Sequence, residues 1–167
     1  MKVLVTDTSV LVDLERGSLL EATFSLPVTL AVPDLLYAQE LSNYNGPQLL
    51  DLGLQVFELD GQGVEMADNY WKQVRTISLP DSFALVLAKT SGFILLTGDG
   101  ALRNLAQREE VECHGVLWIL DFLEREQVVA ITNLYEGLNQ IANHPRCRLP
   151  KPEVSLRLNR FAKQLEL

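Results

Sequence analysis

The fold class is predicted by residues 2–12, which read KVLVTDTSVLV. Residues 2–6 are an apolar, β-branched run that is typical of a buried parallel strand. Asp7, Thr8 and Ser9 follow directly, and each can cap a helix that the next apolar residues continue. The stretch therefore predicts a strand, a tight turn and a helix, with polar side chains at the carboxyl end of the strand.

The same alternation of strand and helix signals continues along the chain. Further strands are expected over residues 29–32, 54–59 and 93–97, and helices over 19–24, 35–42, 48–52, 64–74, 81–90 and 101–108. This order predicts an α/β fold, with an open, mostly parallel sheet between helices in three α/β/α layers. In such folds the functional crevice lies beyond the carboxyl ends of the strands.

A helical extension follows, with helices expected over residues 116–126, 133–143 and 154–165. Three prolines between residues 145 and 152 predict an irregular segment before the last helix. We therefore divide the chain into a domain of residues 1–143 and a basic C-terminal arm and helix of residues 144–167. The second part is too short to be an independent domain.

Length and composition restrict the class of protein. At 167 residues and 47% hydrophobic composition, the chain can bury a core without disulfides. No run of about 18 apolar residues predicts a membrane span, so we expect a cytoplasmic protein with no membrane partner. Cys113 and Cys147 provide neither a disulfide framework nor a tetrahedral metal set, even together with His114 and His144. Both thiols are expected to be reduced.

Charge is distributed unevenly along the chain. The net charge is −8, yet residues 144–167 contain six basic and two acidic residues, a net charge of +4, which leaves −12 in residues 1–143. That excess of negative charge would repel nucleic acid unless metal ions or a basic patch intervene. The alternative interpretation is that the acidic surface only keeps the protein soluble. Two uses of the basic tail stay open: it binds a nucleic-acid backbone, or it packs as a strap against the acidic remainder of its own chain or of a dimer mate.

Four carboxylates stand out by their positions. Asp7 and Asp99 each come after a strand and before a helix, so a parallel sheet would bring both to one edge. Helical periodicity turns Asp81 and Glu40 towards apolar neighbours rather than towards polar ones. Helix capping is the alternative interpretation for Asp7, Asp99 and Asp81, and a helix-edge position is the alternative for Glu40.

Carboxylates that meet in one crevice require a compensating cation, because each like charge raises the pKa of the others. Oxygen ligands select a hard ion such as Mg²⁺ or Mn²⁺, and the lack of a His/Cys set in the sequence argues against Zn²⁺.

Several motifs in this order are similar to those of a known family. They are DTSVLVDL at residues 7–14, Glu40 within an expected helix, LPDSFAL at residues 79–85 and LLTGDGAL at residues 95–102. Together they resemble the motifs of PIN-domain ribonucleases, whose best-known members are VapC-type toxins. The resemblance covers about residues 1 to 110 and implies a parallel sheet flanked by helices. It also implies a catalytic, metal-binding set of Asp7, Glu40, Asp81 and Asp99, with Ser9 and Thr97 as supporting hydroxyls.

The activity implied by this resemblance is metal-assisted hydrolysis of RNA by Mg²⁺ or Mn²⁺, leaving a 3′-hydroxyl and a 5′-phosphate. It further implies a toxin role, a small antitoxin-like protein partner and a homodimer. The chain departs from a minimal VapC-like protein by its helical extension, to which no functional residue is carried over.

Two rival functions remain open. A PIN-like module could bind a partner and cut nothing, although the presence of all four acids favours a nuclease. A phosphoryl-transfer α/β domain also begins with an Asp after its first strand. The phosphatase pattern, however, places a second Asp where Ser9 stands, and the response-regulator pattern places a Lys where residues 97–99 read TGD.

Overall fold

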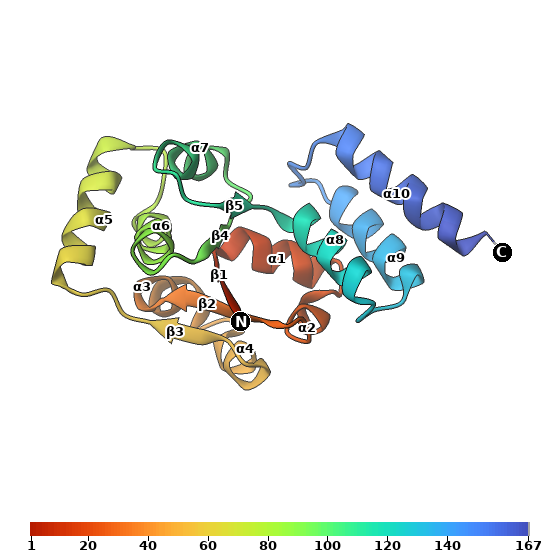
Figure 1. Ribbon diagram of the computed structural model, residues 1–167, viewed down its shortest axis with the longest axis horizontal. Coiled ribbons are helices and arrows are strands. Elements are labelled where there is room, and N and C mark those ends of the chain that lie inside the picture. Colours follow the sequence, from red (N-terminus) through yellow and green to blue (C-terminus); the bar gives the residue numbers. More distant parts are fainter. Residues whose placement is uncertain (167) are drawn as a thin grey trace.

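The computed structural model describes residues 1–166, in which a five-stranded parallel sheet lies between two layers of helices (Figure 1). Its strands are β1 (Lys2–Thr6), β2 (Val28–Pro33), β3 (Gln55–Phe57), β4 (Ile94–Leu96) and β5 (Cys113–His114). They pair in the order β3-β2-β1-β4-β5, and every pair is parallel. The predicted three-layer α/β fold is confirmed.

The helices follow the predicted order, with several boundaries shifted. They are α1 (Thr8–Arg16), α2 (Leu20–Thr23), α3 (Asp34–Leu36), the π-helical turn η1 (Tyr37–Leu41), α4 (Gly46–Leu52), α5 (Gly61–Gln73), α6 (Leu79–Ser91), α7 (Gly100–Arg108), α8 (Val116–Glu126), α9 (Ile131–Ala142) and α10 (Lys151–Leu165). Helix α5 begins earlier than expected because Asp60 caps it, accepting a hydrogen bond from the backbone N–H of Gly63 at 2.7 Å.

Two local features differ from the sequence-based expectation. The segment predicted as one helix over 35–42 is a short α-helix followed by η1, in which the backbone N–H of Ser42 donates to the carbonyl oxygen of Tyr37 at 2.8 Å. Strand β5 was not predicted at all. Its two residues are too short to show a period, and only pairing with β4 makes them a strand.

The two faces of the sheet bury separate hydrophobic clusters. Successive strand residues point to opposite faces, so Leu4 and Leu96 join a cluster with α1, α4 and α8–α10, whereas Val5 and Leu95 pack against α6 and α7. Central strands with both faces covered read as continuous apolar runs, as residues 3–5 do.

The C-terminal helices α8, α9 and α10 gather at the end of the molecule opposite α5 (Figure 1). Phe161 of α10 is fully buried in the cluster around α1 and α8. Arg157 and Arg160 form ion pairs with Asp121 of α8 at 2.8 and 2.9 Å, and Arg160 also reaches Glu124 at 2.8 Å. These contacts strap α10 to its own chain. The domain boundary at residue 143 stays a prediction.

The segment between α9 and α10 is irregular, as its prolines predicted. We call residues 143–150 the arm. Within it, the backbone N–H of Arg146 donates to Nδ1 of His144 at 3.1 Å, and that of Leu149 donates to Sγ of Cys147 at 3.4 Å.

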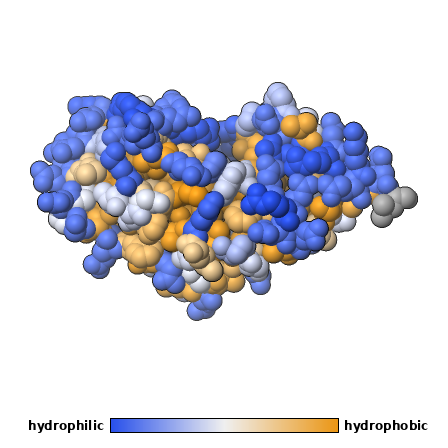
Figure 2. Space-filling view, in the orientation of Figure 1, coloured by the Kyte–Doolittle hydropathy of each residue, from blue (hydrophilic) through white to orange (hydrophobic). Residues whose placement is uncertain are grey.

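Large hydrophobic side chains remain exposed around the β3 edge of the sheet. They are Leu50 and Leu52 of α4, Val56 of β3, and Val64 and Trp71 of α5. Figure 2 shows hydrophobic residues across the middle of one face and hydrophilic residues towards both ends. The homodimer stays a prediction. Within residues 1–166, no helix combines the length and hydropathy that crossing a membrane requires.

Two glycines bring α9 close to the carboxyl end of α1. A Cβ atom at Gly137 would lie 2.6 Å from the carbonyl oxygen of Gly17 and 2.8 Å from Cδ1 of Leu19. A Cβ at Gly17 would lie 2.8 Å from Cδ1 of Ile141. Because these distances are too short for real Cβ contacts, larger residues would push the extension away from the sheet domain.

We therefore expect Gly137→Ala to destabilise the protein by about 1–3 kcal/mol, because backbone overlap outweighs the gain in helix propensity of about 1 kcal/mol. Urea unfolding monitored by circular dichroism measures this change. The matched control is Gly61→Ala, where a new Cβ meets nothing within 4 Å. A Gly137→Ala protein as stable as the Gly61→Ala protein would contradict the proposed close contact.

Candidate active site

Asp7 and Asp99 lie at the carboxyl ends of two paired strands. Asp7 comes directly after β1, Asp99 comes three residues after the end of β4, and the register aligns Thr6 with Leu96. Each acid also caps the next helix: Oδ1 of Asp7 accepts from the N–H of Val10 at 3.0 Å, and Oδ2 of Asp99 accepts from that of Leu102 at 3.0 Å. The structure thus supports capping and a shared sheet edge together.

A hydrogen-bond network connects the loops that carry these two acids. Asp7 is only 2% exposed. Its Oδ1 accepts from the Ser9 hydroxyl at 2.7 Å, and its Oδ2 accepts from the Thr97 hydroxyl. In turn, Oγ of Ser9 accepts from the N–H of Gly98, and Oγ1 of Thr97 accepts from that of Asp99, both at 3.0 Å. Ser9 and Thr97 therefore position both acids.

Glu40 and Asp81 reach the same region from helices. Glu40 lies on η1, and its Oε1 accepts a hydrogen bond from the Thr8 hydroxyl at 2.5 Å. Thr8 directly follows Asp7 in the chain, so this bond brings Glu40 close to Asp7. Asp81 lies in the first turn of α6, where the Ser78 hydroxyl oxygen accepts from its backbone N–H at 3.1 Å. Both side chains are half-buried, as the helical periodicity predicted.

The acids act on one another electrostatically. The pKa of Asp81 is raised to about 7, first by burial, then by the charges of Asp7 and Glu40 and, more weakly, Asp99. Burial also raises the pKa of Asp7, against the hydrogen bonds from Thr97 and Ser9. All four predicted acids therefore belong to one electrostatic group, centred on Asp81.

The chemistry of this group fits a hard divalent cation. All its charged donors are carboxylate oxygens, which Mg²⁺ and Mn²⁺ prefer, and a cation would relieve the repulsion that raises the pKa of Asp81. As the side chains stand, however, no three His, Cys, Asp or Glu residues within 1–166 are close enough together to hold one ion.

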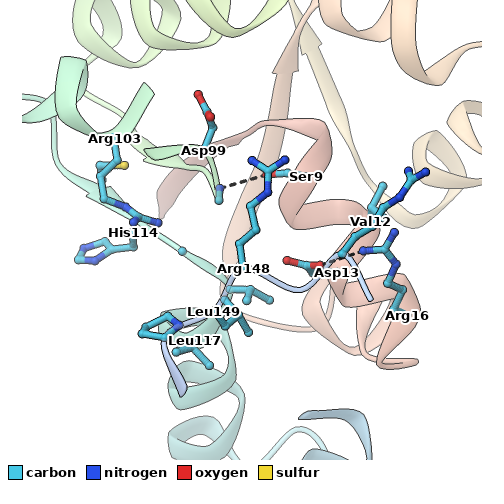
Figure 3. Close-up of a pocket in the computed structure, with 16 residues that line it drawn as sticks. Ser9, Val12, Asp13, Arg16, Asp99, Arg103, His114, Leu117, Arg148 and Leu149 are labelled. Atoms are coloured by element: carbon cyan, nitrogen blue, oxygen red, sulfur yellow. Dashed lines mark hydrogen bonds and ion pairs between the residues drawn. The ribbon is translucent and has the colours of Figure 1, made fainter. Parts of the chain in front are cut away.

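A basic cavity adjoins the acidic group. It has a volume of about 520 Å³, and its lining includes Ser9, Gly98 and Asp99 (Figure 3). Four arginines also line it: Arg16, Arg103, Arg146 and Arg148. The sequence indicated the two arm arginines as part of a basic tail but missed Arg16 and Arg103. Helical spacing was the available signal, since Arg103 follows Asp99 by one turn and Arg16 follows Ser9 by two.

The raised pKa of Asp81 predicts how stability depends on pH. Between about pH 4 and pH 7, the folded protein keeps the Asp81 proton that the unfolded chain has lost, so this group makes stability fall as pH rises. Asp81→Asn removes the charge. We expect it to raise the free energy of unfolding by about 1–3 kcal/mol at pH 8, discounted for partial exposure, and by much less at pH 4.5.

Urea unfolding in EDTA at both pH values measures this difference. Glu65→Gln, which removes an exposed carboxylate on α5, is the control and should show no such dependence. An equal effect of Asp81→Asn at both pH values would show that neither burial nor the other acids raise the pKa of Asp81 in the folded protein.

Comparison with known proteins supports the fold and identifies the family of the chain. A PilT N-terminus domain protein from the hyperthermophilic archaeon Sulfolobus solfataricus has a similar fold, with a TM-score of 0.51 and 16% sequence identity. The match covers 73% of this chain and 94% of that chain. None of the curated proteins matches the sequence significantly. The family model DUF3368, described as a PIN domain, matches residues 3–163, nearly the whole chain. The protein therefore belongs to the PIN-domain family.

Proposed function

We propose that this PIN-domain protein is a metal-dependent endoribonuclease that hydrolyses RNA phosphodiester bonds with Mg²⁺ or Mn²⁺. The observation that carries the proposal is the electrostatic group at the sheet edge, in which Asp7, Glu40 and Asp99 all act on Asp81. Such a group destabilises the fold at neutral pH and is explained by a function that uses a bound cation.

The proposed metal ligands are Asp7, Asp81 and Asp99, with Glu40 binding directly or through water. When bound, one or two ions would activate a water molecule and offset negative charge on the phosphate. The chain itself supplies orientation. Ser9 and Thr97 hold the two oxygens of Asp7 from opposite sides, and the Thr8 hydroxyl holds Glu40.

The resemblance to VapC-type toxins supports a finer proposal, in which the protein is the toxin of a toxin–antitoxin pair and binds a small antitoxin-like protein. We place this activity in the cytoplasm, where the free thiols of Cys113 and Cys147 would stay reduced. Co-expression with the product of an adjacent small gene, followed by co-purification, tests the partner.

The two rival functions are less well supported. The strand order 3-2-1-4-5 differs from the 2-1-3-4-5 order of response regulators, which argues against a phosphoryl-transfer domain of that type. A silent interaction module would gain nothing from mutually repelling carboxylates, one buried and three half-buried, whose cost is explained by a catalytic cation.

Asp99→Asn should abolish Mn²⁺-dependent cleavage of a fluorescent RNA oligonucleotide. Loss of an outer-shell partner typically costs about 10–100-fold in activity, and loss of a direct ligand should cost at least that much. The fold should survive, because Asn caps a helix as well as Asp does.

Asp60→Asn is the matched control, since Asp60 caps α5 by the same kind of hydrogen bond as Asp99 caps α7. We expect it to keep full activity, and EDTA to abolish cleavage by every active variant. Cleavage by Asp99→Asn at the rate of the unaltered protein would refute the proposed function.

A further inference from the structure

The basic cavity is built from segments that lie far apart in the chain. Helix α1 contributes Arg16, helix α7 contributes Arg103, and the arm contributes Arg146 and Arg148. Figure 3 shows Arg148 extending from the arm towards Ser9 and Asp99. The cavity therefore places positive charge beside Asp99, the one proposed metal ligand among its lining residues.

Its arginines are lightly engaged within the protein. Arg16 lies 3.5 Å from Asp13, and Arg103 donates to the carbonyl oxygen of Thr97 at 3.3 Å. Within residues 1–166, the guanidinium groups of the two arm arginines, by contrast, have neither an ion-pair partner nor a hydrogen-bond acceptor. Two cations thus remain available to an anion that enters the cavity.

The cavity also offers apolar surface. Val12, Leu117 and Leu149 lie among its lining residues, so it combines cations with aliphatic surface. A volume of about 520 Å³ lies within the usual range for a bound small molecule, roughly 300–1,000 Å³. A nucleotide matches both parts of this lining, because its phosphate can pair with guanidinium groups and its base and sugar can contact the aliphatic side chains.

The arm is held where it can present these groups. On one side it follows α9, which contacts α1 closely at Gly137, and on the other side it leads into α10, whose Phe161 is fully buried. The arm's own Leu149 packs against the main hydrophobic cluster. Neighbouring structure thus limits the loss of conformational entropy that binding would otherwise cost.

We propose that this cavity is a nucleotide subsite, which binds the phosphate and base of the RNA nucleotide next to the bond that is cut. This inference rests on the proposed ribonuclease function. It assigns the arm arginines to RNA binding, while Arg157 and Arg160 strap α10 to the protein. It also explains how a chain with −12 net charge in residues 1–143 can hold a polyanion.

The test compares Arg146→Gln/Arg148→Gln with the unaltered protein. Binding of a 12-nucleotide, fluorescein-labelled single-stranded RNA is measured by fluorescence anisotropy in EDTA, at several NaCl concentrations. We expect Kd to rise about tenfold or more at low salt. The slope of log affinity against log salt should become shallower by about 0.7, the value for one lost phosphate contact on a single strand.

The matched control is Arg125→Gln/Lys163→Gln, which removes the same charge from exposed positions on α8 and α10 away from the cavity. It should change Kd less than twofold. Circular dichroism checks that both double variants unfold at the temperature of the unaltered protein, as expected for changes at exposed side chains.

The outcomes separate this proposal from the proposed function. If the unaltered protein binds and cleaves RNA and the arm variant binds equally well, the subsite is refuted and the ribonuclease stands. If the unaltered protein binds RNA but does not cleave it with Mn²⁺, the ribonuclease fails, and the shifts in Kd and slope still decide the subsite. If the unaltered protein does not bind the RNA in EDTA, the subsite is refuted, and Mn²⁺-dependent cleavage decides the ribonuclease separately. Tighter binding by the arm variant would mean that the arm blocks the cavity, which also refutes the subsite.

Discussion

The buried carboxylate of Asp7 is the constraint on which the rest of the site depends. An acid that is only 2% exposed is costly to bury, and three hydrogen bonds, from Ser9, Val10 and Thr97, offset that cost. Because Thr97 lies in the loop after β4, these bonds also fix the positions of two separate strand ends. Burial nevertheless keeps the pKa of Asp7 above its usual value. A cation bound nearby would therefore stabilise the charged form of this carboxylate.

Two oppositely charged groups lie next to each other at this edge of the sheet. The acids around Asp81 lie on one side, and the arginine-lined cavity adjoins Ser9 and Asp99 on the other. A hard cation suits the first group, and a phosphate suits the second. In the proposed reaction, the acids would hold the cation at the phosphate that is cut, and the cavity would hold the neighbouring nucleotide in place.

The C-terminal helices contribute to this edge through packing at a distance. The close approach at Gly17 and Gly137 sets α9 against α1, and the ion pairs of α10 with α8 hold the last helix. Because α9 and α10 are both held in place, the short arm between them is restricted in the conformations it can adopt. It passes beside the cavity and contributes to its lining. The extension is therefore part of the architecture that shapes the site, as well as a cover for one face of the sheet.

The sequence alone was sufficient to predict the order of strands and helices, the parallel sheet, and the positions of Asp7 and Asp99 after strands. Those properties are local, since burial periodicity and capping residues are visible within a few positions of the chain. The half-buried positions of Asp81 and Glu40 also followed from helical periodicity. Only the tertiary structure decided the π-helical turn under Glu40, the two-residue strand β5 and the cavity that joins Arg16, Arg103 and the arm. The strand exists because of its pairing, and the cavity exists because packing brings distant segments together, and neither cause leaves a periodic signal in the sequence.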